Sequence, residues 1–544
     1  MVLPTASKNQ KIVFCIIFLL CLFIQVIPVI RSGLTYDYGI GFWGSNGHDG
    51  VWHLGLINHI SNPLKISMSV FAGEALKNYH PLFDILIAFF SKITFISTSI
   101  WLFQIFPLIS ASLFLFLSFF LGRQITGKYS GALLLMVLNS ISNSLGWIVS
   151  FIRFGSLNGE SLFWAMQSPS HQLNPPFALS ILLILLLIYL LQFPRPNKIF
   201  IFLILIFLPI IKVYSAIPAF IIFAYYSLKN KSYLKTLFLS IFFAALLFFQ
   251  YNSTSASLIL FKPLWFANTL IESPDRLFLP KITNMRYALE NSGRIGPRLI
   301  AIYLGSLLLF LVGNFSWRLI AIKDIFKKPE LLWSILVCTL IPIFFIQKGT
   351  NWNTIQFLYY ALFLANIPLS VYLTRNSKLI PVIIILNLLP LIGSLPNYLG
   401  AIPPTAIPPK EIEALNFLKQ QKPGIVLTYP YDKYIRQNIS TRPLPLYAYE
   451  TTSYVAAYSH HFTYLEDEMN LENSSFPWQP RLESIKEYFR QDNSHANRGF
   501  IINNQIDYLY LLKNAPSSLE TFANVDYLEP IFDNSEIIIY RVKR

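Results

Sequence analysis

Residues 12–30 read IVFCIIFLLCLFIQVIPVI, an unbroken apolar stretch that follows Lys8 and Lys11. A stretch of this length can cross a bilayer core of roughly 30 Å as a single helix. It is long for the core of a signal peptide and has no small-residue cleavage site, so we expect an uncleaved first span. The two preceding lysines favour a cytoplasmic N-terminus.

Comparable apolar stretches recur throughout residues 1–404. The chain is 54% hydrophobic, 16% aromatic and only 13% charged, which is too apolar for a soluble protein. The sequence therefore predicts a polytopic α-helical membrane protein with about 11–13 transmembrane helices. The further candidate spans are 79–97, 99–121, 131–149, 177–193, 199–211, 213–228, 234–251, 299–316, 331–346, 355–373 and 379–396.

Charge sorts the connections between these spans into two groups. About 28 Lys/Arg but only about 10 Asp/Glu lie in residues 1–404, so the whole net charge of +15 arises there. Short basic connections are expected in the cytoplasm, and the intervening connections 31–78, 150–176, 252–298 and 347–353 then lie outside. The basic connections carry Arg123/Lys128, Arg195/Lys198, Lys229/Lys231/Lys235, Arg318/Lys323/Lys327/Lys328 and Arg375/Lys378. Because these residues are scattered among spans, nucleic acid is not an expected partner.

One part of this topology is inconsistent. Two full crossings within 79–121 would place Arg123 outside, against the basic character of its connection. Either one of the segments 79–97 and 99–121 is re-entrant or interfacial, or another of the spans is wrong.

Residues 405–544 have the pattern of a soluble α/β domain, and the topology places them outside a plasma or inner membrane. The Pro-rich stretch 402–409 favours a linker between this domain and a membrane domain over 1–404. Helical spacing is found in 410–420 and 481–490, and strand patterns in 424–429, 506–512 and 536–542. The chain has no Gly-rich nucleotide-binding loop, which argues against a nucleotide-sugar substrate. Its three cysteines exclude a disulfide framework.

The connection after the first span holds the leading candidate for acid–base chemistry. Residues 41–54 read GFWGSNGHDGVWHL, a glycine-rich loop followed by a helical pattern from Asp49 to about residue 60. Asp49 and His53 share one helix face, and His48 precedes them. A carboxylate here could accept the proton of an acceptor hydroxyl. Asp49 could instead be only the N-cap of the helix, and Asp37 is the alternative base.

Further polar residues stand where apolar segments begin or break. His80 enters the segment 79–97, and His171 with Gln172 opens the span 177–193. Both sites could bind substrate. Otherwise the segment at His80 is an ordinary helix entry with proline at its start, and the segment at His171 is a polar loop. Lys212, two residues before Tyr214, interrupts two apolar pieces, and a lysine at such depth usually faces a polar cavity. The helical spacing of Asn353, Gln356 and Tyr360 likewise favours a cavity-lining stripe.

The tail contains His460 and His461 followed by Glu466, Asp467 and Glu468. Their spacing matches no strong zinc motif, and hydrogen bonding or solvation is the more common role of such a segment. We therefore assign no metal ligands.

Taken together, these motifs resemble the GT-C glycosyltransferases, among them the protein O-mannosyltransferases and the lipid A aminoarabinose transferases. The resemblance rests on the Asp after the first span, the absence of a nucleotide fold and the external α/β domain. The motifs also resemble, in more detail, a group of uncharacterised prokaryotic membrane proteins assigned to that superfamily. The motifs that carry it are Gly47-His48-Asp49, His53-Leu54, Tyr79-His80-Pro81-Leu82, His171-Gln172, Asn353 with Gln356-Phe357, Val426-Leu-Thr-Tyr-Pro430 and Ile538-Ile-Tyr-Arg-Val542.

The resemblance implies inverting transfer of a sugar from a polyprenyl-phosphate donor to a glycan, lipid or protein acceptor outside the cell membrane. Asp49 would then be the general base, and Lys212, with Arg153, Arg294 or Arg298, would hold the leaving phosphate. The first loop has one Asp where a paired-acid motif would hold a cation, so the sequence does not require a divalent metal. The alternatives are a lipid or polysaccharide transporter or flippase, and a non-catalytic membrane protein that binds polyprenyl phosphate.

Overall fold

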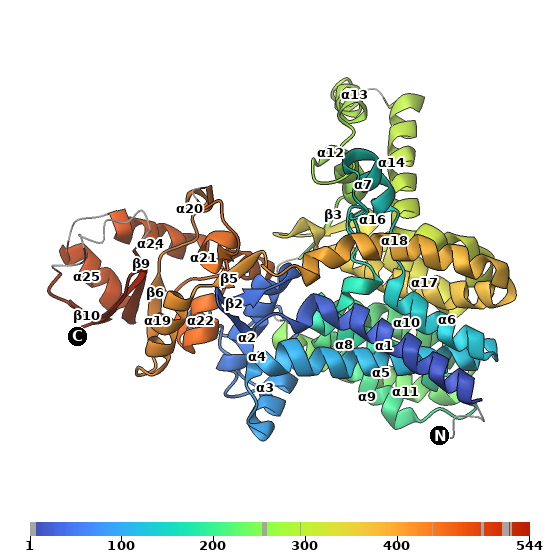
Figure 1. The fold of residues 1–544 in the computed structure, drawn as a ribbon, viewed down its shortest axis with the longest axis horizontal. Coiled ribbons are helices and arrows are strands. Elements are labelled where there is room, and N and C mark those ends of the chain that lie inside the picture. Colours follow the sequence, from blue (N-terminus) through green and yellow to red (C-terminus); the bar gives the residue numbers. More distant parts are fainter. Residues whose placement is uncertain are drawn as a thin grey trace. The chain divides into compact units, whose positions relative to one another are not determined.

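The structure is a computed structural model that describes residues 7–252, 258–293, 295–437, 439–490, 494–513, 522 and 525–543. The chain forms two compact units. The membrane unit comprises Met1–Pro28, Pro107–Gln250 and Ser255–Leu399. The second unit comprises Val29–Phe106, Tyr251–Thr254 and Gly400–Arg544. We call it the external unit because the loop charges predict that it lies outside the membrane. The first loop, 31–78, therefore belongs to the same unit as the tail (Figure 1).

The membrane unit is built almost entirely of helices. They are α1 (Lys8–Ile30), α5 (Phe106–Thr126), α6 (Tyr129–Ile141), α7 (Gly146–Phe154), α8 (Pro175–Leu190), α9 (Lys198–Ile211), α10 (Val213–Lys229), α11 (Leu234–Tyr251), α12 (Trp265–Glu272), α13 (Pro280–Asn291), α14 (Pro297–Phe315), α15 (Ile322–Ile325), α16 (Pro329–Phe344), α17 (Gln356–Arg375) and α18 (Ile380–Leu399). Short 3₁₀ turns are η3 (Ser168–Leu173), η4 (Lys231–Tyr233), η5 (Ser316–Ala321), η6 (Asn351–Ile355) and η7 (Ser377–Leu379), and β3 (Ile259–Phe261) pairs with β4 (Phe345–Gln347).

The chain is a multi-pass helical membrane protein. Among the described residues, six helices are long and apolar enough to cross a bilayer, and a seventh span is possible if α6 and α7, bent by 48° at a short break, count as one. Four more apolar helices, α8, α9, α10 and α16, have only 10–17 residues each. The expected spans thus form helices, but several are shorter than the roughly 20 residues of a simple crossing. The six long spans are Lys8–Ile30, Thr98–Thr126, Lys231–Tyr251, Pro297–Ile325, Asn351–Arg375 and Ser377–Leu399.

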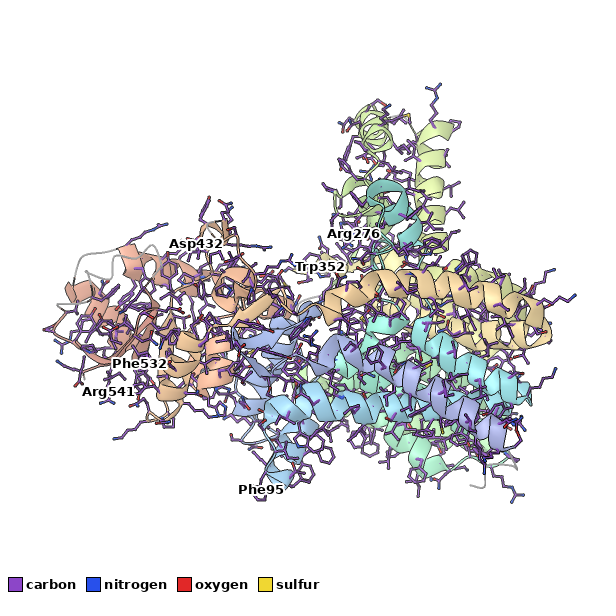
Figure 2. The ribbon with its side chains drawn as sticks, in the orientation of Figure 1. Phe95, Arg276, Trp352, Asp432, Phe532 and Arg541 are labelled. Atoms are coloured by element: carbon purple, nitrogen blue, oxygen red, sulfur yellow. The ribbon has the colours of Figure 1, made fainter. Side chains whose placement is uncertain are left out.

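The inconsistency within 79–121 has a structural answer. Thr98–Thr126 is a candidate span, whereas α3 (Leu82–Thr94) has only 13 residues. One face of α3 exposes apolar side chains, with Phe89 and Ile93 each more than half exposed. Phe95 follows the helix in a left-handed conformation and is 95% exposed (Figure 2). An exposed apolar face of this kind suits the membrane interface, which favours the interfacial alternative for this segment.

Close helix packing holds the membrane unit together. A Cβ on Gly122 of α5 would lie 2.8 Å from the carbonyl oxygen of Gly131 in α6, so these helices touch through their backbones. The largest core cluster joins α8, α10, α16 and α17 through residues such as Ile184, Phe223 and Leu358. In lipid, small residues at helix contacts permit the van der Waals packing that drives association.

The basic connections gather at one end of this unit, here called the basic end. The ends of α8, α10 and α17 and the start of α16 line a single cavity there, together with Lys229, Lys327 and Arg375. Arg318 was expected in the basic connection with Lys323, Lys327 and Lys328, but the structure places it inside the membrane unit. It is 2% exposed, and its Nε donates to Oδ1 of Asn366 at 2.9 Å. The helix that begins with α14 continues through η5 and α15, so the connection starts after Arg318.

The external unit contains two sheets and short helices. Its elements in the segment Val29–Phe106 are β1 (Thr35–Tyr36), β2 (Gly39–Phe42), η1 (Gly44–Gly47) and α2 (Asp49–His59) in the first loop, followed by α3, α4 (Thr98–Ile100) and the π-helical turn η2 (Trp101–Ile105). Those in the tail are β5 (Thr405–Ile407), α19 (Pro409–Lys419), β6 (Ile425–Thr428), α20 (Lys433–Gln437), β7 (Leu444–Pro445), α21 (Leu446–Tyr449), α22 (Tyr454–Ser459), β8 (Phe462–Thr463), α23 (Glu468–Asn473), α24 (Gln479–Arg490), α25 (Ser494–Asn503), β9 (Ile506–Leu512), β10 (Leu528–Asp533) and β11 (Ile537–Val542).

One sheet joins the first loop to the tail in the order β1-β2-β5-β7. Its strand β5 corrects the expected linker, because Thr405, Ala406 and Ile407 are buried and pair with β2. The other sheet has the order β10-β11-β9-β6-β8, with β6 parallel to both β8 and β9. The predicted helices α19 and α24 and strands β6, β9 and β11 are confirmed, while β10 was not predicted.

Candidate active site

The glycine-rich loop brings Asp49 to the start of a buried helix. Asn46 donates to Oγ of Ser32 at 3.0 Å and to the carbonyl of Trp43 at 2.8 Å, which fixes the loop before α2. A Cβ on Gly47 would lie 2.5 Å from Thr405, and one on Gly50 would lie 2.6 Å from Phe103. The glycines on either side of the His-Asp pair therefore permit close packing inside the external unit.

Asp49 is the first residue of α2, and the N-cap is His48, whose side chain makes no capping hydrogen bond. From the sequence, Asp49 could have been only the N-cap of this helix. Because His48 occupies the N-cap position, the structure does not favour that role for Asp49. The side chain of Asp49 is 51% exposed, although the next eight residues of α2 are all buried. The helix thus presents one accessible carboxylate at its N-terminus, where the helix dipole stabilises negative charge.

The imidazole of His48 links Asp49 to a second carboxylate. Its Nδ1 lies 2.9 Å from Oδ1 of Asp49, and its Nε2 lies 3.3 Å from Oδ1 of Asp467. The contact with Asp467 is an ion pair. Asp467 is fully buried and caps α23 by accepting from the backbone N–H of Asn470 at 3.2 Å. Its position is therefore fixed independently of His48.

The charge state of His48 follows from this arrangement. Burial alone would lower the pKa of the imidazole, but the negative charges of Asp467 and Asp49 outweigh it and hold the pKa well above its usual value. The raised pKa favours the protonated, positively charged form of the imidazole between the two carboxyl groups. The exposed carboxylate of Asp49 is held in one orientation, as a proton acceptor requires.

Asp37, the alternative base, lies in a different environment. It sits in the turn between β1 and β2 and is exposed to solvent. Among the residues described, no hydrogen bond or ion pair orients its carboxylate. The geometry therefore favours Asp49.

A second imidazole–carboxylate pair lies one helical turn further along α2. Nδ1 of His53 lies 2.7 Å from Oδ1 of Asp84 on α3, and both side chains are buried. The hydroxyl of Tyr79 accepts from Nε1 of Trp52 at 3.2 Å and lies 3.5 Å from the same ring nitrogen of His53. His53 therefore braces α2 against α3. The ring of His80 stacks on Tyr79 with centroids 4.8 Å apart, beside this pair.

The external unit also contains a cleft at the carboxyl ends of its parallel strands, here called the tyrosine cleft. Its lining includes Thr428–Tyr431 after β6, Leu465–Glu468 after β8, and Tyr510 with Leu512 at the end of β9. The space between its walls is about 440 Å³, part of it open to solvent. Since β8 and β9 flank β6 on opposite sides, the cleft lies where the strand order reverses, a preferred binding position in α/β sheets.

The lining of the tyrosine cleft is aromatic and acidic. Among the described residues it contains five tyrosines, at 429, 431, 447, 454 and 510, and four carboxylates, at 450, 466, 467 and 468, with no Lys, Arg or His. Burial raises the pKa of Glu468 to about 7 and that of Glu466 to about 8. Thr452 also lines the cleft, is 6% exposed, and has a hydroxyl without a hydrogen-bond partner among the described residues.

The histidines and acids considered as metal ligands have other roles. Nε2 of His461 lies 2.9 Å from the carbonyl of Leu418, and its Nδ1 accepts from the backbone N–H of Gly424 at 3.2 Å. Glu466 accepts from the backbone N–H groups of Val455 and Ala456 at the start of α22. Within the described part of the chain, no group of three or more His, Cys, Asp and Glu could hold a metal ion.

The membrane unit brings several predicted binding residues together in a polar cluster of Asn174, Lys212, Asn353 and Gln356. Nζ of Lys212 donates to Oδ1 of Asn174 at 3.4 Å, and Nδ2 of Asn174 donates to Oε1 of Gln356 at 3.5 Å. Nε2 of Gln356 in turn donates to Oδ1 of Asn353 at 3.4 Å. The cluster joins residues from three separate stretches of the sequence.

Lys212 is the cation of this cluster. It is the extended residue between α9 and α10, with φ −160° and ψ 106°, and is 6% exposed. Its Nζ lies 5.6 Å from the ring centroid of Tyr214, within the range of a cation–π contact. The hydroxyl of Tyr214 donates to Oε1 of Gln347 at 3.0 Å. The break between the helices is thus lined with polar groups.

His171 and Gln172 lie in the buried turn η3 rather than on a surface loop. Nδ1 of His171 lies 2.8 Å from the carbonyl of Ser168, and Oε1 of Gln172 accepts from Oγ of Ser110 at 2.9 Å. The ring of His171 packs against Phe114 and Phe363. In this conformation both side chains join η3 to the surrounding helices.

The three arginines proposed for phosphate binding are not equivalent. Nη1 of Arg153 donates to the carbonyl of Arg276 at 3.1 Å, and Nη2 to that of Phe278 at 3.2 Å, so the guanidinium holds the segment before α13. The guanidinium of Arg276 in turn lies over the ring of Trp164, 4.0 Å from its centroid. Arg298 is exposed in the first turn of α14. Arg294 lies outside the described residues.

Sequence reasoning missed three residues of these sites: Asp467, Asp84 and Asn174. Asp467 stands out in the sequence only as part of the acidic tail segment, and Asp84 has no signal of its own there. The sequence holds one signal for Asn174, which stands just before two prolines and caps α8 by accepting from the backbone N–H of Phe177.

No protein-family model matches the chain, and no curated protein matches its sequence. Among solved structures, the chain is similar to the oligosaccharyltransferase of Archaeoglobus fulgidus, with a TM-score of 0.49 and 10% identity over 93% of this chain and 69% of that one. It is similar to ArnT from Cupriavidus metallidurans bound to undecaprenyl phosphate, with a TM-score of 0.39 and 10% identity over 98% of both chains.

A further similar structure is the arabinofuranosyltransferase AftD from mycobacteria, with a TM-score of 0.47 and 12% identity over 99% of this chain and 40% of that one. The likeness extends over more than nine tenths of this chain in each case. TM-scores below 0.5 at these identities assign neither an activity nor a residue role to it.

Proposed function

We propose that this protein is a membrane glycosyltransferase that moves a sugar from a polyprenyl-phosphate donor to a hydroxyl of an acceptor on the extracytoplasmic face. The observation that carries the proposal is the half-exposed carboxylate of Asp49, oriented by a buried His48 that Asp467 braces.

The proposed reaction is a single displacement at the anomeric carbon. The acceptor oxygen attacks that carbon, and the bond from the carbon to the phosphate oxygen breaks with inversion. The proton of the acceptor hydroxyl passes to Oδ of Asp49, and polyprenyl phosphate leaves as an anion. Removing the proton as the new bond forms is general-base catalysis, which typically accounts for about 10²–10⁴-fold in rate.

We assign to Lys212 the role of stabilising the negative charge that develops on the leaving phosphate. A cation that is already in place where negative charge develops stabilises the transition state more than the ground state. The polar cluster of the membrane unit supplies such a cation together with amide donors from Asn174 and Gln356. His171 and Gln172 would shape this region through packing and would not touch the phosphate.

The acceptor is assigned to the tyrosine cleft of the external unit. Asp467 both lines this cleft and contacts His48, so an acceptor bound there would lie next to the His48–Asp49 pair. Tyrosine faces and carboxylates suit a hydroxyl-rich acceptor, and the absence of cations from the lining disfavours a phosphorylated one.

The test compares lipid-linked sugars and envelope glycans by mass spectrometry in cells that lack the protein. Cells supplied with the wild type should consume one lipid-linked sugar and contain one glycosylated product. Cells supplied with Asp49→Asn should accumulate that donor and lack the product, and cells with Asp37→Asn should resemble the wild type. Unchanged donor and product profiles after deletion of the protein would contradict glycosyl transfer.

A further inference from the structure

A large cavity opens at the basic end of the membrane unit. It encloses about 1170 Å³, part of it open to solvent, between the ends of α8, α10 and α17 and the start of α16. Binding sites for small organic molecules commonly measure about 300–1,000 Å³. No residue of the polar cluster lines this cavity, so the proposed reaction does not account for it.

The walls of this cavity have two chemical parts. Its inner wall is apolar and includes the buried side chains of Ile188, Ile222, Leu331 and Ile367. Its mouth is predominantly basic, because four cations there outnumber two acids. The cations are Lys229, Lys327, Lys328 and Arg375, and the acids are Asp324 and Glu330.

Internal ion pairs use only some of these cations. Asp324 is buried and pairs with both Lys327, at 3.0 Å, and Arg375. Lys229 lies over the ring of Tyr225 at 4.6 Å. No ion pair joins Lys229 or Lys328 to any carboxylate among the residues described. These two cations can therefore face an anion that enters the mouth.

We propose that this cavity binds an anionic phospholipid of the bilayer, with its phosphate between Lys229 and Lys328 and an acyl chain along the apolar wall. Each part of the lipid then meets a suitable part of the cavity. The basic mouth binds the anionic headgroup, as basic pockets between membrane helices do. The apolar wall removes the surface of the acyl chain from water. A free phosphate ion would leave the wall uncovered. The helix ends that form the mouth lie where the basic connections predict a membrane surface.

The experiment uses the full chain, purified in detergent and titrated with short-chain phosphatidylglycerol or phosphatidylcholine, with binding followed by native mass spectrometry. Phosphatidylglycerol should bind the wild type more tightly than phosphatidylcholine. The double variant Lys229→Gln/Lys328→Gln should lose about 10- to 30-fold in affinity for phosphatidylglycerol only. The matched control is Lys323→Gln/Lys378→Gln, which removes the same charge from exposed lysines that do not line the cavity.

Three results would overturn the proposal. The first is equal binding of the two lipids by the wild type. The second is an equal loss of affinity in the control and test variants, which would indicate general surface charge. The third is displacement of phosphatidylglycerol by millimolar inorganic phosphate with the same affinity, which would indicate an ion site. None of these readouts depends on sugar transfer, so failure here leaves the proposed function intact.

Discussion

Nε2 of His48 lies 3.3 Å from Oδ1 of Asp467, so a residue of the first loop is braced by a residue of the tail. Both belong to the external unit, which combines these two parts of the chain. The orientation of Asp49, on the other side of the imidazole, therefore depends on the fold of the tail.

Asp467→Asn should reduce the alkaline sensitivity of the protein. The pKa of His48 is raised in the folded state, so its ion pairs stabilise the protein fully below the unfolded pKa, and this stabilisation is lost as pH rises through the raised folded value. The introduced asparagine can still cap α23, since Asn caps nearly as well as Asp. Thermal unfolding from neutral to alkaline pH should show a smaller fall in Tm for the variant. An unchanged pH dependence would show that Asp467 does not hold the charge of His48.

Asp84→Asn should destabilise the external unit without abolishing chemistry. It replaces a charge-assisted contact with His53 by a neutral one between two buried side chains, and such contacts contribute roughly 1.5–3 kcal/mol. The double variant His53→Gln/Asp84→Asn tests the coupling, because the two losses should be less than additive. Denaturant or thermal unfolding in detergent measures the loss of stability in each variant. The folded fraction of each variant should still transfer sugar. Full additivity would mean that the two residues act separately.

Lys212→Met should weaken donor binding. Methionine keeps much of the side-chain volume and removes the charge that we assign to the leaving phosphate. The loss of a charge-assisted hydrogen bond corresponds to about 10-fold or more in affinity. Lys235→Met, in an exposed position of α11, is the control. The measurement is the affinity of each monodisperse variant for polyprenyl phosphate. Equal affinities of Lys212→Met and Lys235→Met would show that Lys212 does not bind the phosphate.

Much of the fold follows from the sequence because its signals are local. Apolar length identifies the helices of the membrane unit, and the break at Lys212 is where the sequence placed it. The helix from Asp49 follows from its spacing, as do α19 and the strands β6, β9 and β11. Loop charge also indicated that two crossings within 79–121 are inconsistent with the other predicted spans.

The contacts that build the site could not be predicted in the same way. Nothing near His48 in the sequence indicates Asp467, because tertiary folding alone brings the two together. Asn174 likewise joins Lys212 and Gln356 only through helix packing. The Pro-rich stretch 402–409 has the composition of a linker, yet pairing with β2 buries Thr405 as part of a strand. Long-range partners of this kind override local propensity.

The central claim is that Asp49 is the general base, and the rate of sugar transfer by Asp49→Asn tests it most directly. Asn preserves the size and hydrogen bonding of the side chain but cannot accept the proton. The measurement is single-turnover transfer from a purified polyprenyl-phosphate sugar, with donor binding and Tm as controls. We predict wild-type donor binding, a Tm close to that of the wild type and a rate lower by about 10²–10⁴-fold. Transfer by Asp49→Asn at the wild-type rate would contradict the account.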